Sequence, residues 1–154
     1  MRCRRTLAFF SALGLAGLFA STSASAACTF STTAAVSFPV YDVFSTADDD
    51  STGAFTIGCT TNTSAMISLS AGGGGSFSPR SMGGPGGSLL NYNLYSDGGR
   101  TAVWGDGTGG SAPLSRSFSA GVPLTFTMYA RIFRNQRGVT AGLYSDSVMV
   151  TVAP

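Results

Sequence analysis

Short runs in which apolar and polar residues alternate constrain the fold of this chain more than any other feature. The clearest run covers residues 124–132. Its apolar members are Leu124, Phe126, Met128, Ala130 and Ile132, and single Thr, Tyr or Arg residues separate them. Successive side chains of a β-strand point to opposite faces, so this run predicts a strand with one face in a core and the other in water. Residues 27–154 contain no sustained helical period, and the sequence therefore predicts an all-β fold.

Shorter alternating runs occur at 55–59, 67–69 and 90–94. The first two runs lie close together in the sequence, and they predict a β-hairpin. About seven short strands in roughly 130 residues are typical of two-sheet sandwiches. We therefore predict an immunoglobulin-like β-sandwich, although the alternation does not determine how its strands are connected.

The last predicted strand covers residues 142–152. Val148, Val150 and Val152 repeat with period two and share one face, and the residues between them take the other face. Almost no sequence follows this strand, so a strand that pairs beside it has to come from upstream or from another chain. This arrangement predicts a partner that completes the fold.

The N-terminus has the regions of a secretory signal. Basic residues at positions 2, 4 and 5 precede an apolar run over 7–20, and Ala24-Ser25-Ala26 fits an A-x-A cleavage site. We interpret residues 1–26 as a signal peptide and 27–154 as one exported domain. A membrane anchor is less favoured, because a spanning helix needs roughly 20 apolar residues. A lipoprotein is a further alternative because Cys28 lies near the cut, but a lipobox favours Leu where this chain has Ser25.

The composition of the predicted mature domain excludes most catalytic arrangements. Residues 27–154 hold six Arg against seven Asp, a net charge of −1, and they contain no His, Glu or Lys. No Ser-His-Asp triad, Lys nucleophile or His-containing zinc site can be formed. We predict that the protein is not an enzyme and needs no cofactor, metal or small-molecule substrate. The absence of a basic patch predicts that it does not bind nucleic acid.

Cys28 and Cys59 are the two cysteines left after signal removal, and we predict that they form a disulfide. In the chain-entropy model, closing a loop of this length contributes roughly 3.5 to 4 kcal/mol. The alternatives are two free thiols or a metal pair, and a metal pair lacks a third ligand nearby.

Three further segments are candidates for sites. Residues 71–87 are rich in Gly, and they predict a mobile surface loop because neither a helix nor a Lys accompanies them for phosphate binding. The Asp residues at 48–50 could bind calcium, but their spacing differs from an EF-hand and favours a solvated turn. Trp104 is expected to be packed, with its N–H hydrogen-bonded.

Several short sequence motifs follow one another along the chain. They are Tyr41-Asp42, Cys59, Arg80 with Met82, Leu90-Asn-Tyr-Asn-Leu-Tyr-Ser-Asp97, Trp104-Gly-Asp-Gly-Thr108, Tyr129-Ala-Arg-Ile132, Gln136 and Gly142-Leu-Tyr-Ser-Asp-Ser-Val-Met-Val-Thr-Val152. In this order they resemble the spore coat protein U domain family, which includes the subunits of archaic chaperone–usher pili. The resemblance covers nearly all of residues 27–154.

The resemblance implies an immunoglobulin-like sandwich that lacks its final strand and is completed by a donor strand. It also implies export through the periplasm to the cell surface, with a periplasmic chaperone, an outer-membrane usher and other pilus subunits as partners. We expect the chaperone to pair along residues 143–152. The residues expected to form the groove for the donated strand are Leu124, Phe126, Met128, Val148, Val150 and Val152. The alternative is that all six are ordinary core residues, and the sequence does not separate the two.

Some features depart from the family. Ala130 stands where related subunits often have Gly, and Val152-Ala-Pro154 replaces an aromatic or hydrophobic end. If the signal is cut after Ala26, the domain begins at Ala27 with almost no N-terminal extension. We then expect a subunit that accepts a strand but has none obvious to donate, at a fibre's end or outside the polymer.

The leading hypothesis is therefore a structural and adhesive subunit of a chaperone–usher fimbria, used in attachment and biofilm formation. The alternative is a spore-coat or cell-envelope protein whose sandwich is complete by itself. A sugar-binding module that uses Trp104 is a third hypothesis, because a fold alone does not determine function.

Overall fold

The computed structural model describes residues 27–154, and the signal peptide predicted for residues 1–26 lies outside this part of the chain. The regular secondary structure of the described residues is almost entirely β-strand. The strands are β1 (Cys28–Ala34), β2 (Asp49–Cys59), β3 (Thr63–Leu69), β4 (Arg80–Gly83), β5 (Leu89–Tyr95), β6 (Leu114–Phe118), β7 (Leu124–Ile132) and β8 (Val150–Ala153), with one 3-10 turn, η1 (Pro85–Gly87), between β4 and β5.

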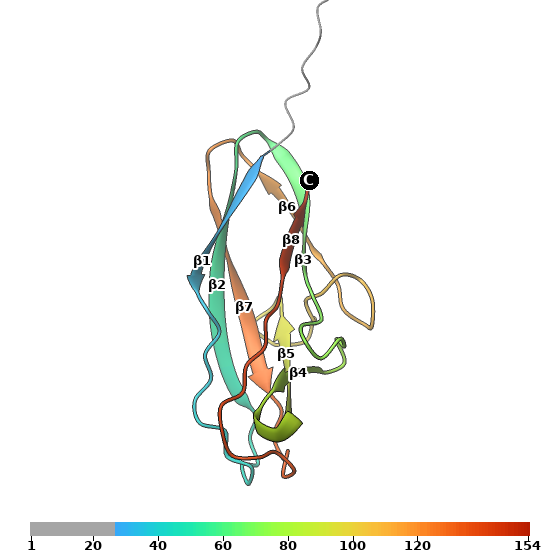
Figure 1. The fold of residues 1–154 in the computed structure, drawn as a ribbon. Helices are drawn as coiled ribbons and strands as arrows, with labels where there is room; N and C mark the ends of the chain where they lie inside the picture. The colour runs from blue at the N-terminus through green and yellow to red at the C-terminus, as the bar shows by residue number, and fades with distance from the viewer. Residues whose placement is uncertain (1–26) are drawn as a thin grey trace, which may run out of the picture.

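The strands form two antiparallel sheets that face each other. One sheet has five strands in the order β1-β2-β7-β5-β4, and the other has three in the order β6-β3-β8. In Figure 1 the three-stranded sheet lies in the upper part of the view, whereas β4 and β5 lie in the lower part. This architecture confirms the predicted immunoglobulin-like β-sandwich.

The core lies where the two sheets overlap. Phe55 of β2 packs against Phe126 of β7 and against Trp104, with ring centroids 5.5 Å and 5.7 Å apart. Trp104 is 1% exposed, and its Nε1 donates a hydrogen bond to the Ile67 carbonyl of β3 over 2.9 Å. Both expectations for Trp104 are confirmed. Its ring is not presented to solvent, which removes the basis for a sugar-stacking site at this residue.

The hairpin predicted from the runs at 55–59 and 67–69 is wrong. β2 pairs with β1 and β7, whereas β3 pairs with β6 and β8 in the other sheet. The short link between them crosses from sheet to sheet, and the Asn62 side chain holds it by accepting a hydrogen bond from Ala120 N. Alternation correctly predicted both strands, but it carries no information about which sheet a strand joins.

The mobile loop predicted for residues 71–87 is also wrong, because this segment contains β4 and η1. β4 pairs with β5, and the side chains of Arg80 and Met82 are buried. The preceding glycines are held as well, since Gly73 N donates to the carboxylate of Asp146. Gly72 has φ of +72°, and an added Cβ there would collide with the same carboxylate.

The C-terminal strand is shorter than the predicted span of 142–152. Only Val150–Ala153 forms a ladder, with β3, and Ser145 makes an isolated bridge to Gly83 at the edge of β4. The ladder stops because β3 ends at Leu69. The predicted alternation is nevertheless present, because Val148, Val150 and Val152 are half-buried and the residues between them are exposed.

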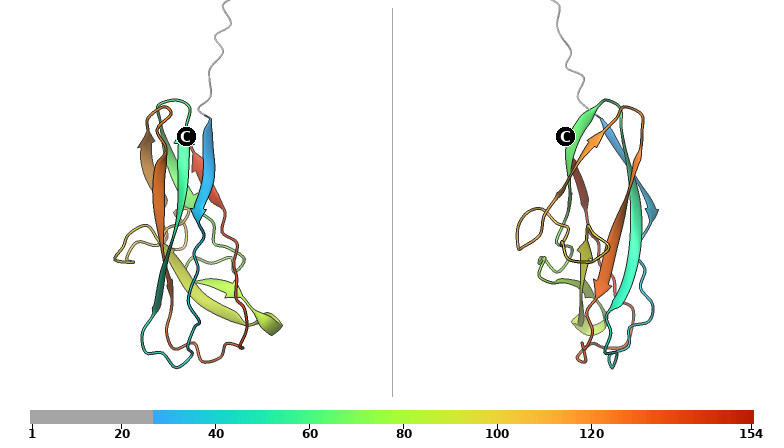
Figure 2. Two further views of the ribbon diagram at one scale, coloured as in Figure 1. Left: turned by 90° about the vertical axis from the view of Figure 1, so that its left-hand side faces the viewer. Right: turned by 180° about the vertical axis from the view of Figure 1, so that it is seen from behind.

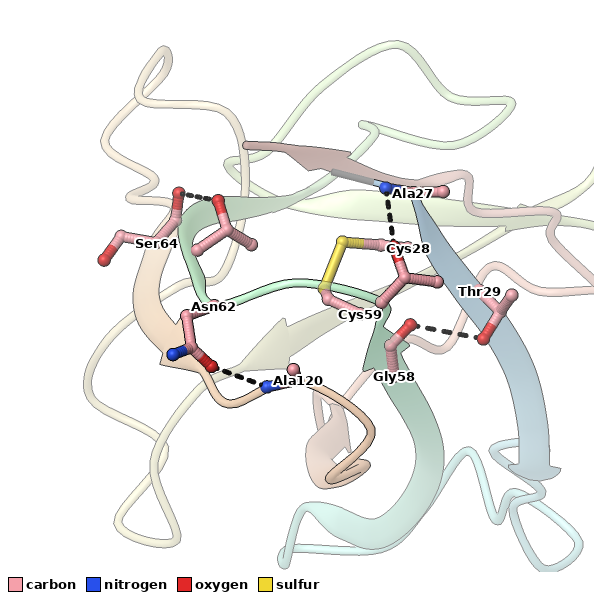
Figure 3. Close-up of a disulfide and its surroundings, with 10 residues drawn as sticks. Ala27, Cys28, Thr29, Gly58, Cys59, Asn62, Ser64 and Ala120 are labelled. Carbon is pink, nitrogen blue, oxygen red and sulfur yellow. Dashed lines mark hydrogen bonds between the residues drawn. A yellow bond between two sulfur atoms is a disulfide. The ribbon is translucent and has the colours of Figure 1, made fainter. Parts of the chain in front are cut away.

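A disulfide joins Cys28 and Cys59, as predicted. The two residues lie directly opposite each other at the start of β1 and the end of β2 (Figure 3). Near the disulfide, Thr60 N donates to the Ala27 carbonyl, Ala27 N donates to Thr60 Oγ1, and Thr29 Oγ1 donates to the Gly58 carbonyl. This end of β1 is therefore fixed covalently to β2, its only neighbouring strand within residues 27–154.

The Asp residues at 48–50 do not form the predicted solvated turn, because β2 begins at Asp49 and the flanking carboxylates form ion pairs. Asp50 lies 2.7 Å from Arg131 Nε and 3.2 Å from Arg100 Nη1, and Asp48 also approaches Arg131. The hydrogen bond from Arg131 holds the pKa of Asp50 below its ordinary value. Residues 27–154 contain no group of His, Cys, Asp or Glu side chains that could hold a metal ion.

Candidate functional site

An apolar groove of about 990 Å³ opens over the lower half of the five-stranded sheet. Its floor is the inner face of this sheet, which the shorter three-stranded sheet leaves partly uncovered (Figure 1). Four strands contribute to the floor through Phe55, Met82, Leu90, Tyr92, Leu94, Met128 and Ile132. All of these side chains point inward because each occupies the core-facing position of an alternating strand.

Two segments without regular ladders form the sides of the groove. On one side residues 35–44 follow β1, and on the other side residues 139–149 lead into β8. Both contribute partly buried apolar side chains, namely Val36, Phe38, Tyr41, Val139, Tyr144, Val148 and Val150.

Each side of the groove continues into a strand with one unpaired edge. Within residues 27–154, β1 is hydrogen-bonded only to β2, and β8 is hydrogen-bonded only to β3. Residues 35–44, which follow β1, and the segment that leads into β8 line the same groove, and they lie beside each other in the left view of Figure 2. Another strand can pair with the unpaired N–H and C=O groups of a strand edge and pack its side chains on the apolar surface beside it.

The C-terminal side of the groove is strand-like over its whole length. From Leu143 to Val152 exposed and half-buried residues alternate without interruption, although only the last few residues join a ladder. Near its middle, Ser70 N donates to the Met149 carbonyl, and Met149 N donates to Ser70 Oγ. An extended segment with one free edge is therefore already present beside the groove.

The residues predicted for the donor-strand groove divide into two groups. Met128, Val148 and Val150 line the groove. Leu124 and Val152 are partly buried and Phe126 is 7% exposed, and all three pack nearer the disulfide end, in the core between the two sheets. The role of the six residues in strand acceptance stays a prediction.

Sequence reasoning missed the side of the groove formed by residues 35–44. Val36, Phe38 and Val40 repeat with period two, which was the available signal. It also missed that Leu90, Tyr92 and Leu94 of β5 form the floor, although it predicted their strand. Their position depends on the sheet order, which alternation does not reveal.

One carboxylate connects the C-terminal side of the groove to the floor. Asp146 accepts hydrogen bonds from Tyr92 Oη over 2.6 Å, from Gly73 N over 2.7 Å and from Ser147 N over 2.8 Å. Burial, followed by the hydrogen bond to Asp146, raises the pKa of Tyr92 far above its ordinary value, so its hydroxyl keeps its proton. The bond thus links β5 to the segment that precedes β8.

Tyr41 and Gln136, which both belong to the sequence motifs, are hydrogen-bonded to each other at the side of the groove formed by residues 35–44. Tyr41 Oη donates to the Phe133 carbonyl over 3.1 Å and accepts a hydrogen bond from Gln136 N over 2.9 Å. Gln136 Nε2 in turn donates to the carbonyl of Asn91 in β5. These bonds fasten the segment that follows β1 to the ends of β7 and β5.

Arg80, which also belongs to the sequence motifs, is completely buried at the end of the groove floor. Its guanidinium donates to the carbonyls of Ser70 and Trp104 and to Asn93 Oδ1. Burial lowers the pKa of Arg80, and no carboxylate forms an ion pair with it in the described part of the chain. The arginine joins β4, β5 and the end of β3 through carbonyl and amide oxygens alone.

The lower end of the molecule carries unusually exposed apolar side chains. Val40 is 97% exposed, Leu143 is 93% exposed and Phe44 is 72% exposed. They belong to the two segments that flank the groove, and these segments reach the end of the molecule opposite the C-terminus (Figure 2). Within residues 27–154 no helix has the length and apolar character needed to cross a membrane.

The fold is a two-sheet immunoglobulin-like sandwich with an apolar groove, and the strands at the two sides of the groove each have one unpaired edge within residues 27–154. The model of the Spore Coat Protein U domain family matches residues 15–151, so the chain belongs to this family. No curated protein matches the chain.

Among solved structures, the chain is similar to one from the CsuC–CsuE chaperone–tip adhesion subunit pre-assembly complex of the archaic chaperone–usher Csu pili of Acinetobacter baumannii. The two share 20% sequence identity with a TM-score of 0.58. The match covers 84% of this chain and 40% of the other, so this chain spans less than half of that protein. At this identity the likeness concerns the fold.

Proposed function

We propose that this protein is a subunit of a chaperone–usher surface pilus and that its groove accepts a strand from another chain. The observation that carries the proposal is the apolar groove between the unpaired edges of β1 and β8. A donated strand would satisfy both edges through main-chain hydrogen bonds and fill the groove with alternate side chains. Family membership and the likeness to a chaperone–usher pilus complex support this reading.

The proposal includes the partners that such a groove requires during export. An apolar groove with open edges is an aggregation hazard in water, so a periplasmic chaperone would supply the first strand. An outer-membrane usher and a neighbouring pilus subunit would then replace it at the cell surface. Residues 143–152 would form one of the two strands that pair with the insert.

We propose further that the subunit is adhesive and contributes to attachment and biofilm formation. Val40, Phe44 and Leu143 support this role, because they are large, strongly exposed apolar side chains at the rim of the groove, and a group of such side chains is typical of an interaction site. The two segments that contain them reach the end of the molecule opposite the C-terminus, so a surface could contact this end while the rest of the subunit stays in a fibre.

The test is a pull-down of the tagged protein from the periplasm of its native host, with partners identified by mass. Val148→Asp places a charge in the groove, whereas Met149→Asp places it on the adjacent, exposed position of the same segment. We expect the wild type and Met149→Asp to carry a stoichiometric chaperone or pilus subunit, and Val148→Asp to lose it.

Hydrogen exchange of the captured complex should show new protection in β1 and in residues 146–153, where backbone groups are now open. Recovery of a stable lone monomer from the native periplasm would overturn the proposal. That result would favour the alternative, a self-contained spore-coat or cell-envelope protein.

A further inference from the structure

We infer that the strand accepted by this groove carries one cationic side chain, which faces Asp146 between apolar neighbours. This inference rests on the proposed strand-accepting function and adds the chemistry of the partner. The charges of the residues that line the groove support this inference. Among the described residues that line the groove, the charged ones are Asp42 and Asp146, and none is Arg or Lys.

Asp146 occupies a position where the alternation predicts an apolar residue. It lies on the inward face of residues 143–152, between Tyr144 and Val148, and it is half-buried. The three groups that donate to it, a tyrosine hydroxyl and two backbone amides, are all neutral. A carboxylate has about four lone-pair sites, so one acceptor position is left open, and no group of opposite charge donates a hydrogen bond to Asp146 within residues 27–154.

The neighbouring cation, Arg80, attracts Asp146 through space, but its guanidinium forms its hydrogen bonds with other groups. Arg80 directs its guanidinium to the carbonyls of Ser70 and Trp104 and to Asn93. No ion pair between Arg80 and Asp146 occurs within residues 27–154. Asp42 lies on the opposite side of the groove and adds charge of the same sign.

Insertion of a purely apolar strand over Asp146 would therefore be unfavourable in free energy. It would remove water from an ionised carboxylate and supply no hydrogen-bond donor in return. A guanidinium or ammonium group at the facing position replaces the lost water with a charge-assisted hydrogen bond. Because inward side chains of a strand repeat every second residue, the positions two before and two after it meet the apolar parts of the groove.

The test uses fluorescently labelled strand peptides with Val or Ile at inward positions and Ser or Thr at outward positions. One inward position at a time carries either arginine or citrulline, which has the same shape without the charge. Affinity for the full-length exported protein is measured by fluorescence anisotropy. We expect one inward position at which the arginine peptide binds about tenfold tighter than its citrulline twin, as for a hydrogen bond to a charged group.

Three controls test whether this gain in peptide affinity depends on Asp146. Asp146→Asn should abolish the preference for arginine, whereas Asp106→Asn, in an exposed loop, should leave it unchanged. Raising the salt concentration should reduce the preference. Arginine at an outward position of the peptide should give no gain over citrulline.

The outcomes separate this inference from the proposed function. If citrulline and arginine peptides bind equally well at every position, the cationic side chain is excluded while strand acceptance stands. If no peptide binds in any form, strand acceptance itself fails, and the inference fails with it. If Asp146→Asn does not fold, the comparison of the two peptides on the unaltered protein still decides.

Discussion

At the scale of single residues, Arg80 shows how a buried charge can be accommodated without a counter-ion. Its guanidinium is enclosed by Ser70, Asn93 and Trp104, and the Phe77 ring lies 4.8 Å away. Planar guanidinium presents several donors in a fixed arrangement, which suits a cluster of oxygen acceptors contributed by separate elements. The residue thus acts as a junction between the two sheets.

Replacement of Arg80 tests this role. Arg80→Ala removes the donor to the Ser70 and Trp104 carbonyls and one of the two donors to Asn93 Oδ1, and we expect a loss of about 3 kcal/mol or more in the free energy of unfolding. Arg80→Lys should recover only part of this loss because its ammonium cannot reach all three acceptors. Urea unfolding, followed by the fluorescence of the single tryptophan, measures both changes.

Arg116→Ala is the matched control, because Arg116 is exposed on β6. It should change the free energy of unfolding by no more than about 0.5 kcal/mol. An Arg80→Ala protein as stable as the control would show that the buried hydrogen bonds of Arg80 do not hold the sheets together.

At the scale of elements, β1 is an edge strand whose first residue is fixed by the disulfide. Within residues 27–154 it pairs only with β2, and its register shifts between Thr32 and Ala34. Replacement of Cys28 and Cys59 by Ala should lower the free energy of unfolding by about 3 to 4 kcal/mol in the chain-entropy model. Hydrogen exchange should become faster in β1 before it does in β3 or β7.

Thr29→Ala provides the comparison for this prediction, because it removes a single hydrogen bond to Gly58 at the same end of β1. We expect it to cost about 1 kcal/mol or less. Unchanged protection of β1 after loss of both cysteines would mean that its ladder with β2 suffices.

The strands also show how much of the fold could be predicted from the sequence. Alternation predicted β7 and the core faces of β2 and β5, because the two faces of a strand are recorded locally in the sequence. It could not predict that β2 and β3 enter different sheets, since pairing depends on distant partners. It missed β4 because this strand has only two inward residues, and one of them is the charged Arg80.

The candidate site was predicted less completely than the fold. Met128, Val148 and Val150 belong to strong alternating runs and do line the groove. Asp146 and Tyr92 form their hydrogen bond across a separation of 54 residues, and no local pattern records such a pairing.

At the scale of the whole molecule, the two ends differ in character. One end carries the disulfide and the C-terminus, and the other is formed by the segments that contain Val40, Phe44 and Leu143. Replacement of all three apolar residues by Ser should reduce binding to an apolar surface such as polystyrene severalfold. Their exposure means that little packing is lost, so the free energy of unfolding should change by less than about 1 kcal/mol.

Met66→Ser with Val122→Ser is a suitable control for this experiment, because both residues are exposed but lie away from that end. The control protein should bind the surface as the wild type does. Equal loss of binding in the two variants would show that general hydrophobicity, and not the apolar end, governs adhesion.

The two open edges also have a mechanical consequence. β1 and β8 run roughly along the long axis of the molecule (Figures 1 and 2). Ladder hydrogen bonds lie across the strands, so tension along a strand held between these edges would strain all of its bonds together and not one after another. A fibre joined in this way would resist pulling without covalent links between subunits, and its strength would increase with the number of paired residues.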